Sequence, residues 1–293
     1  MQQQGVKCNF ADSIPWVILS PIEQSIKQKI ESVGIPLKDW NIQINYGIKT
    51  GFNDAFIIST EKRDEILANC QTEDERVRTA ELIRPILRGR DIKRYEYEWA
   101  DLWIIATFPS RHYDIESYPA VKNYLLSIGI ERLEQTGETH IVNGKKIKAR
   151  KKTSNEWFET QDSISYWEDF SKPKIVWGNL NLTASYAMVQ DNSFINAPSP
   201  VIVPASKFLL AVLNSKLADY YIRQLGVTRN GGYFEYKPMF VEKLPVPQNA
   251  DTKAVTDIES YVDSKNETAI DKAVYMLYGL TEEETLYIDK KGR

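Results

Sequence analysis

Hydrophobic positions near the start of the chain change from a helical spacing to a strand spacing. Isoleucines recur every four residues from Ile22 to Ile30, which is typical of the buried face of an amphipathic helix. Ser20 and Glu23 have the spacing of a capping box, and the proline between them suits the first helical turn. The pattern predicts a helix over residues 20–34.

Strands and further helices intermingle along the rest of the chain. Strict alternation over residues 40–46 predicts a half-buried strand, and apolar runs at 56–58 and 103–108 predict two more. Several short strands are expected between residues 174 and 203, where glycine, asparagine and proline interrupt apolar runs. Helical spacing and start signals predict helices over residues 72–84, 119–135 and 207–225.

This order of elements indicates the fold class. Helices and strands mix without a regular βαβ alternation, so we expect an α+β fold with a mixed sheet and interspersed helices. The proline-containing segment 244–249 separates a body, residues 1–248, from a C-terminal segment, residues 249–293. That segment is expected to form short helices packed on the body, the last one opened by Thr281 and Glu284.

Composition indicates an ordinary globular protein. The chain has 293 residues, 42% of them hydrophobic and 26% charged, which excludes a disordered chain or a coiled-coil rod. Its two cysteines, Cys8 and Cys70, are too few for a disulfide framework. The segment from Met1 lacks the features of a secretory signal and no window is apolar enough to cross a membrane, so a cytoplasmic protein without a membrane partner is expected.

Charge is unevenly distributed along the chain. Residues 1–248 carry 31 Lys and Arg against 30 Asp and Glu, whereas residues 249–293 carry 6 against 10. Residues 144–152 (GKKIKARKK) contain six basic residues and no acid. A basic patch on a nearly neutral body is suited to phosphate contact over a limited surface.

The usual sequence signatures of enzymes and cofactor sites are absent. No two glycines are separated by a single residue, and neither a P-loop nor a serine-hydrolase elbow occurs. Only two histidines are present, His112 and His140, and they are isolated from each other and from the cysteines. We therefore predict no cofactor, no metal site and no catalytic residue in this chain.

One nuclease hypothesis stays open at this point. Glu235 and Lys237 form the E-x-K half of a metal-dependent nuclease site, and Asp219 precedes them by sixteen residues. In such a site the carboxylates bind Mg²⁺ and the lysine positions the attacking water. Against this, Asp219 falls inside a predicted helix, and E-x-K triplets are frequent by chance.

Several segments of the chain are distinctive in combination. The first is residues 45–58 (NYGIKTGFNDAFII). The others are LRGRDIKRY at 87–95, WF at 157–158, YW at 166–167, KPKIVW at 172–177, LNSKL at 213–217, KLPVP at 243–247 and the ending at 270–284. In this order, the segments together resemble the target-recognition domain of TaqI-type adenine DNA methyltransferases and of type IIG restriction enzymes. The resemblance extends over about residues 14–289.

The resemblance implies a module that recognises a short sequence of double-stranded DNA. In the family, a catalytic domain N-terminal to the module binds S-adenosylmethionine, carries an NPPY-like motif and methylates a flipped adenine. This chain has no such tetrapeptide, so the resemblance implies the C-terminal part of a larger enzyme. Mg²⁺ would be needed only if the parent enzyme also cleaves DNA.

The residue types suited to phosphate contact concentrate in the basic run. Asn143 and Gly144 before it are a hairpin-turn pair, so the run is expected on a ribbon or loop. The alternative is a solvated charge run without a ligand. The phosphate-binding candidates are Lys145, Lys146, Lys148, Arg150, Lys151 and Lys152.

Three more sets of loop residues are candidates for DNA contact. The alternatives are turn formation for the first and third sets and, for the second, a structural ion pair between Asp91 and an arginine. Arginine suits guanine edges and asparagine suits adenine edges. The three sets are Lys49, Thr50, Gly51 and Asn53; Arg88, Arg90, Lys93 and Arg94; and Asn179, Asn181, Arg229 and Asn230.

The acidic C-terminal segment supports a third hypothesis. Residues 249–293 could dock a partner protein within a phage-defence complex, in which case contact with DNA would be incidental. The DNA-recognition, nuclease and protein-interaction hypotheses place function in different parts of the chain, so the structure bears on them differently.

Overall fold

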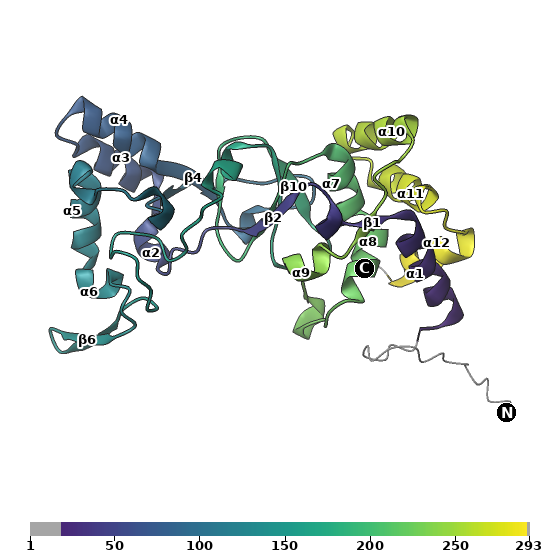
Figure 1. Cartoon of the computed structure of the whole chain (residues 1–293), viewed down its shortest axis with the longest axis horizontal. Coiled ribbons are helices and arrows are strands. Elements are labelled where there is room, and N and C mark those ends of the chain that lie inside the picture. The colour runs from purple at the N-terminus through teal and green to yellow at the C-terminus, as the bar shows by residue number, and fades with distance from the viewer. Residues whose placement is uncertain (1–18, 292–293) are drawn as a thin grey trace.

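Helices, two β-sheets and further helices follow one another along the long axis of the molecule (Figure 1). The structure is a computed structural model and describes residues 19–291. Cys8 and the segment from Met1, on which two of the expectations above rest, lie outside the described residues. The mixture of parallel and antiparallel strand pairs with separate helical layers is α+β, as predicted.

The first sheet separates two hydrophobic cores. Its order is β10-β8-β12-β2 and every pairing is antiparallel. Successive side chains on a strand point to opposite faces. Ile175 and Trp177 accordingly pack with the C-terminal helices, whereas Val176 packs toward the second sheet. The strands are β2 (Gln43–Tyr46), β8 (Lys174–Trp177), β10 (Tyr186–Val189) and β12 (Pro200–Val203).

The second sheet also has cores on both faces. Its order is β11-β4-β5-β3, with β11 parallel to β4 and the other pairs antiparallel. Ile104 packs into the core between the sheets, and Ile105 packs under the helices on the far side. The strands are β3 (Ile57–Ser59), β4 (Ile83–Leu87), β5 (Leu102–Ile105) and β11 (Phe194–Ile195).

The helices over the second sheet only partly follow the sequence-based prediction. The helix expected over residues 119–135 is interrupted at Gly129, whose φ of +104° is incompatible with a continuous helix. α3 was not predicted, because Ile66 is its only buried residue and the apolar pattern is weak. The helices are α2 (Asn53–Phe56), α3 (Thr60–Ala68), α4 (Glu73–Leu82), α5 (Pro119–Ile128) and α6 (Ile130–Leu133).

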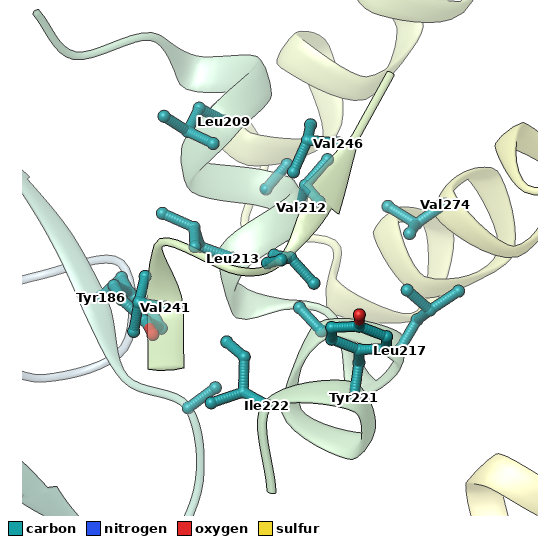
Figure 2. Packing of buried hydrophobic residues seen from close by; sticks show 14 of the residues in the cluster. Tyr186, Leu209, Val212, Leu213, Leu217, Tyr221, Ile222, Val241, Val246 and Val274 are labelled. Carbon is teal, nitrogen blue, oxygen red and sulfur yellow. The ribbon is translucent and has the colours of Figure 1, made fainter. Parts of the chain in front are cut away.

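The opposite helical layer is built around α7 and α8. Figure 2 shows Leu213 from α7, Ile222 from α8 and Val241 from α9 lying close to Tyr186 of the first sheet. These side chains belong to one continuous core. The helices of this layer are α1 (Pro21–Val33), α7 (Lys207–Asn214), α8 (Lys216–Arg223), α9 (Pro238–Val241), α10 (Thr252–Asp263), α11 (Glu267–Leu277) and α12 (Glu282–Lys291).

The single helix predicted over residues 207–225 is wrong, because the chain breaks it between α7 and α8. The buried Asn214 side chain accepts a hydrogen bond from the amide of Tyr186 and donates one to its carbonyl, each 2.9 Å long. Ser215 then caps α8 by accepting from the Ala218 amide. Apolar spacing continues across the break, so periodicity alone does not reveal it.

The C-terminal helices share their core with elements of the body. Ile26 and Ile30 from α1 and Ile270 and Val274 from α11 belong to the same cluster as α7 and α8. The division at residue 248 stays a prediction about how the chain folds. The structure adds that the buried faces of the C-terminal helices cover this common core.

Three short antiparallel ribbons complete the architecture. They pair β1 (Ile35–Pro36) with β14 (Pro245–Val246), β6 (Thr139–Val142) with β7 (Lys145–Lys148), and β9 (Leu180–Asn181) with β13 (Phe234–Glu235). Within residues 19–291, no helix is both long and apolar enough to cross a membrane. The 3₁₀ segments are η1 (Leu37–Asp39), η2 (Gly89–Asp91), η3 (Pro109–Arg111), η4 (Ile115–Ser117), η5 (Trp167–Ser171) and η6 (Asn230–Gly232).

Glu284 on α12 accepts hydrogen bonds from Ser25 and Lys29 on α1, and we expect this contact to be sensitive to acid. Burial raises the pKa of this carboxyl, but hydrogen bonds from Lys29, Ser25 and the Thr281 amide outweigh it and lower the pKa to about 2. The stabilisation is present above the ordinary pKa of about 4.5 and is lost as pH falls toward 2. Glu284→Gln is expected to lower the free energy of unfolding at pH 7 by about 3 kcal/mol.

Urea denaturation at several pH values tests this expectation. The matched control is Glu283→Gln, which neutralises the exposed neighbouring carboxylate on the same helix. The loss caused by Glu284→Gln should shrink between pH 4.5 and pH 2, whereas the control should stay within about 0.5 kcal/mol of wild type. A pH-independent difference between Glu284→Gln and wild type would contradict the role assigned to the ionised carboxylate.

Candidate nucleic-acid interface

Arg150 organises the first candidate surface from inside the protein. Its side chain is 2% exposed and its guanidinium donates to the carbonyls of Thr50, Leu133, Trp157 and Glu159 at 2.7–2.8 Å. Burial, followed by the nearby positive charge of Arg132, lowers the pKa of Arg150 to about 10, so it stays protonated at neutral pH. The expected phosphate contact of Arg150 is therefore corrected to a structural role.

The loop at residues 49–53 lies directly on this buried guanidinium. Gly51 has a φ of +79°, and a Cβ there would lie 3.0 Å from the Arg150 side chain, so the position requires glycine. Thr50 is fully buried and its hydroxyl donates to the Asn53 side chain at 2.7 Å. Thr50 is thus also corrected to a structural role. The side chains that remain exposed are those of Lys49 and Asn53.

The basic run forms the second part of this surface. Asn143 and Gly144, with φ of +49° and +76°, make the tight turn between β6 and β7 that the sequence predicts. Five lysines on or just after the hairpin are exposed, and none makes an ion pair with another residue of the described range 19–291. These free ammonium groups, which we call the hairpin lysines, belong to Lys145, Lys146, Lys148, Lys151 and Lys152.

Arg132 connects the hairpin to the loop, and the sequence contains no local signal for this contact. Its guanidinium donates to the Lys148 carbonyl at 2.8 Å and stacks on the Phe52 ring, with its central carbon 3.9 Å from the ring centroid. Eighty residues separate Phe52 from Arg132, so only the tertiary fold brings them together. The structure therefore brings together the hairpin lysines and the loop at residues 49–53, which are far apart in the sequence.

The arginine-rich set at residues 88–94 divides into structural and exposed members. Arg88 forms a two-point contact with Asp91, 2.8 and 3.0 Å long, which confirms the expected structural pair. Arg94 pairs with Glu267 of α11 at 2.9 Å, so its charge is also used within the protein. Arg90 and Lys93 keep exposed side chains that can reach a ligand.

Asn179 and Asn181 lie beside this set. A Cβ on Gly178 would lie 3.1 Å from the Gly89 carbonyl oxygen, so the two turns touch through their glycines. The Asn181 amide donates to the Gly178 carbonyl at 2.8 Å, a turn-forming contact of the kind considered as an alternative. The Oδ1 atom of Asn179 is buried without a hydrogen-bond partner among the described residues.

Arg229 and Asn230 precede β13 in the ribbon that β9 and β13 form, and they lie at the end of this ribbon away from Asn179. Both are exposed, and the guanidinium of Arg229 makes a 3.0 Å ion pair with Glu235 on β13. Because β13 pairs with β9, this loop is tied to the strand that contains Asn181. In Figure 1 the β6 hairpin and the region around α9 both extend from the lower side of the molecule.

The groups required for the nuclease hypothesis are occupied in other contacts. The Asp219 carboxylate, 7% exposed, accepts hydrogen bonds from the Ala184 amide, Arg223 and the Tyr236 hydroxyl. Glu235 pairs with Lys237 at 2.7 Å and with Arg229. Among residues 19–291, no three acidic, histidine or cysteine side chains are grouped so that they could hold a metal ion. The structure does not support this hypothesis.

The acidic residues of the C-terminal helices bind the body of the protein. Five of them form ion pairs with basic residues outside their own segment, so their charge is partly neutralised internally. The protein-interaction hypothesis therefore loses much of its expected acidic surface. The pairs are Asp263 with Lys207, Glu267 with Arg94, Glu284 with Lys29, and Asp271 and Asp289 with Lys216.

Comparison with known families identifies this architecture as a specificity domain. The family model for the TaqI-like C-terminal specificity domain matches residues 84–246, which is more than half of the chain. The chain belongs to the TaqI-like C-terminal specificity domain family. The resemblance noted in the sequence is thereby confirmed.

Two curated relatives extend the match beyond the family model. The chain is 21% identical over 280 residues to the type II methyltransferase M.XhoI of Xanthomonas vasicola, covering 93% of this chain and 46% of the relative. It is also 21% identical over 286 residues to the type II methyltransferase M.PaeR7I of Pseudomonas aeruginosa, covering 95% of this chain and 45% of the relative. The chain therefore spans about half the length of these relatives.

Solved structures show a similar fold. The type IIL restriction-modification enzyme MmeI, solved in complex with DNA, aligns with 87% of this chain and 36% of its own at a TM-score of 0.57. The type IIG restriction endonuclease BpuSI aligns with 90% of this chain and 32% of its own at a TM-score of 0.52. Both are 13% identical to this chain, so the comparison concerns the fold alone.

Proposed function

We propose that this chain recognises a short sequence in double-stranded DNA as the specificity module of a type II adenine methyltransferase in a restriction-modification system. The observation that carries the proposal is the cluster of hairpin lysines, exposed and without ion pairs in the described residues, on a chain of the specificity-domain family. Unpaired ammonium groups on a protruding ribbon suit a polyanion. Because DNA is the proposed ligand, we place the protein's action in the cytoplasm.

Phosphate binding and base recognition are assigned to different residues in this proposal. The hairpin lysines, together with Lys49, Arg90 and Lys93, would hold the DNA backbone and set the register of the protein on it. Asn53, Arg229 and Asn230 have exposed side chains suited to base edges. Asn179 and Asn181 would position the turn that contacts Gly89, because Asn181 already uses its amide locally.

The chemistry of methylation belongs in this proposal to a domain N-terminal to this region of the parent protein. That domain would bind S-adenosylmethionine and act on an adenine flipped out of the duplex. The names of the curated relatives, both methyltransferases about twice as long as this chain, support the assignment. Mg²⁺ would enter only if the parent protein also cleaves DNA.

Selection from a randomised duplex pool at two salt concentrations tests the proposal. Sequencing of the retained DNA is expected to show an asymmetric motif of several base pairs, with retention falling steeply as salt rises. Retention without an enriched motif would show that the chain binds phosphate but does not recognise a sequence by itself. Absence of retention at both salt concentrations would refute the DNA-recognition role.

Arg229→Ala is expected to change which sequence is preferred. Loss of an arginine contact to a base edge costs about 1–3 kcal/mol of discrimination, so selection with this variant should lose preference at one position of the motif. Lys237→Ala is the matched control, because Lys237 pairs with the same Glu235 carboxylate. An unchanged motif with Arg229→Ala would remove this residue from the base-reading set.

A further inference from the structure

A pocket on the second sheet carries an unusual concentration of arginine. It has a volume of about 360 Å³, within the range of small-ligand sites, and none of the residues nominated for DNA contact lines it. We call it the arginine pocket. Its lining includes Arg78, Arg84, Arg111, Tyr113, Tyr118 and Trp167.

The charges of the arginine pocket are not balanced within the protein. Three guanidinium groups line it, and Glu81 is the one carboxylate in its described lining. The side chains of Arg84 and Arg111 make no ion pair or hydrogen bond with any residue of the described range 19–291. Arg78 donates one hydrogen bond, to the Ser117 carbonyl at 3.3 Å. Three such cations close together favour an anionic ligand.

Stacking orients one of these arginines. The central carbon of the Arg111 guanidinium lies 4.0 Å from the Trp167 ring centroid and 5.8 Å from that of Tyr113. A guanidinium stacked on an aromatic face keeps its N–H groups in the plane, where they can donate to a ligand. Tyr113 and Tyr118 pack edge to face with their ring centroids 5.9 Å apart, and together with Trp167 they form what we call the aromatic wall.

A buried lysine supports the part of the rim that contains Ser171 and Asn192. The Lys174 ammonium, fully buried, donates to the carbonyls of Phe170 and Asp191 at 2.8 and 2.7 Å. The residues that follow those two carbonyls, Ser171 and Asn192, line the pocket. The rim is therefore held by the core, and the pocket is formed before a ligand arrives.

We propose that the arginine pocket binds the phosphate of a nucleotide, with the aromatic wall against its base. Arginine donates two parallel hydrogen bonds to phosphate oxygens, and aromatic side chains stack on bases of any sequence. The nucleotide is either a free mononucleotide or one unit of a DNA strand. This site goes beyond the proposed DNA surface, because it uses neither the hairpin lysines nor the loop at residues 49–53.

Calorimetric titration with adenosine 5′-monophosphate, adenosine and inorganic phosphate tests the site. Adenosine monophosphate is expected to bind at least about tenfold more tightly than adenosine, since charge-assisted hydrogen bonds to phosphate supply the difference. Arg84→Gln and Arg111→Gln should each weaken nucleotide binding roughly tenfold or more. Arg76→Gln is the matched control, because Arg76 lies on the same helix as Arg78 but outside the pocket.

A competing DNA duplex distinguishes the two sources of the nucleotide. Displacement of adenosine monophosphate by duplex assigns the site to DNA, and undiminished binding in its presence assigns it to free nucleotides. Equal affinities for adenosine and its monophosphate, or wild-type affinity in Arg111→Gln, would overturn the proposal. Arg111 lies exposed on η3, so its replacement tests the site even if Arg84→Gln, a change within β4, unfolds the chain.

Discussion

Arg150→Met is expected to lower the free energy of unfolding by about 3–5 kcal/mol and to weaken DNA binding. The substitution removes the donors of four backbone carbonyls, those of Thr50, Leu133, Trp157 and Glu159, around a side chain that is only 2% exposed. Hydrogen bonds to a charged group contribute about 1.5–3 kcal/mol each, but the cost of burying the guanidinium charge, which the substitution removes, offsets part of their sum. Urea denaturation measures the first effect and duplex titration the second.

Two control variants separate the structural role of Arg150 from its charge. Lys151→Met removes the next positive charge in sequence, which is exposed, and should change the free energy of unfolding by less than about 0.5 kcal/mol. Arg150→Lys keeps the charge but lacks the fork that reaches four carbonyls, so most of the loss should remain. Wild-type stability in Arg150→Met would show that the loop at residues 49–53 does not depend on this guanidinium.

Replacing Lys145, Lys146 and Lys148 together with alanine is expected to reduce DNA affinity roughly a hundredfold at 0.15 M salt. Each phosphate contact contributes about 0.9 to the slope of the logarithm of affinity against the logarithm of salt concentration. Three contacts therefore change the slope by about 2.7. With equal affinities of variant and wild type at 1 M salt as the reference, this difference in slope corresponds to a loss of roughly a hundredfold at 0.15 M salt. The preferred sequence should be unchanged, because phosphate contacts are common to all sequences.

A second triple variant controls for net charge. Lys253, Lys272 and Lys290 lie exposed on α10, α11 and α12 and make no ion pair with the residues between 19 and 291. Their replacement by alanine removes the same charge from the other end of the molecule, so it should change the salt slope by much less. If the hairpin variant leaves the slope at its wild-type value, the hairpin lysines do not contact phosphate.

The features that neighbouring residues determine could be predicted from the sequence. The capping box at Ser20 and Glu23 and the four-residue spacing after it predict α1. In the structure the Glu23 amide donates to the Ser20 hydroxyl and the Ser20 amide donates to the Glu23 carboxylate, which are the two hydrogen bonds of a capping box. Asn143 and Gly144 predict the β6–β7 turn, because positive φ angles suit these residue types. Such interactions span a few residues, so the local sequence contains the information needed for them.

Tertiary structure decided which polar side chains remain available to a ligand. Arg150 and Lys151 are adjacent and both positively charged, yet one is buried and donates to four carbonyls, whereas the other is exposed. The break after Asn214 likewise depends on the backbone of Tyr186, which is distant in sequence. The sequence by itself determined the elements with strong local signals, such as α1 and the β6–β7 turn, the α+β class and the family. Only the packing of remote segments determined the candidate surface, because a side chain's exposure and partners depend on residues far from it in the chain.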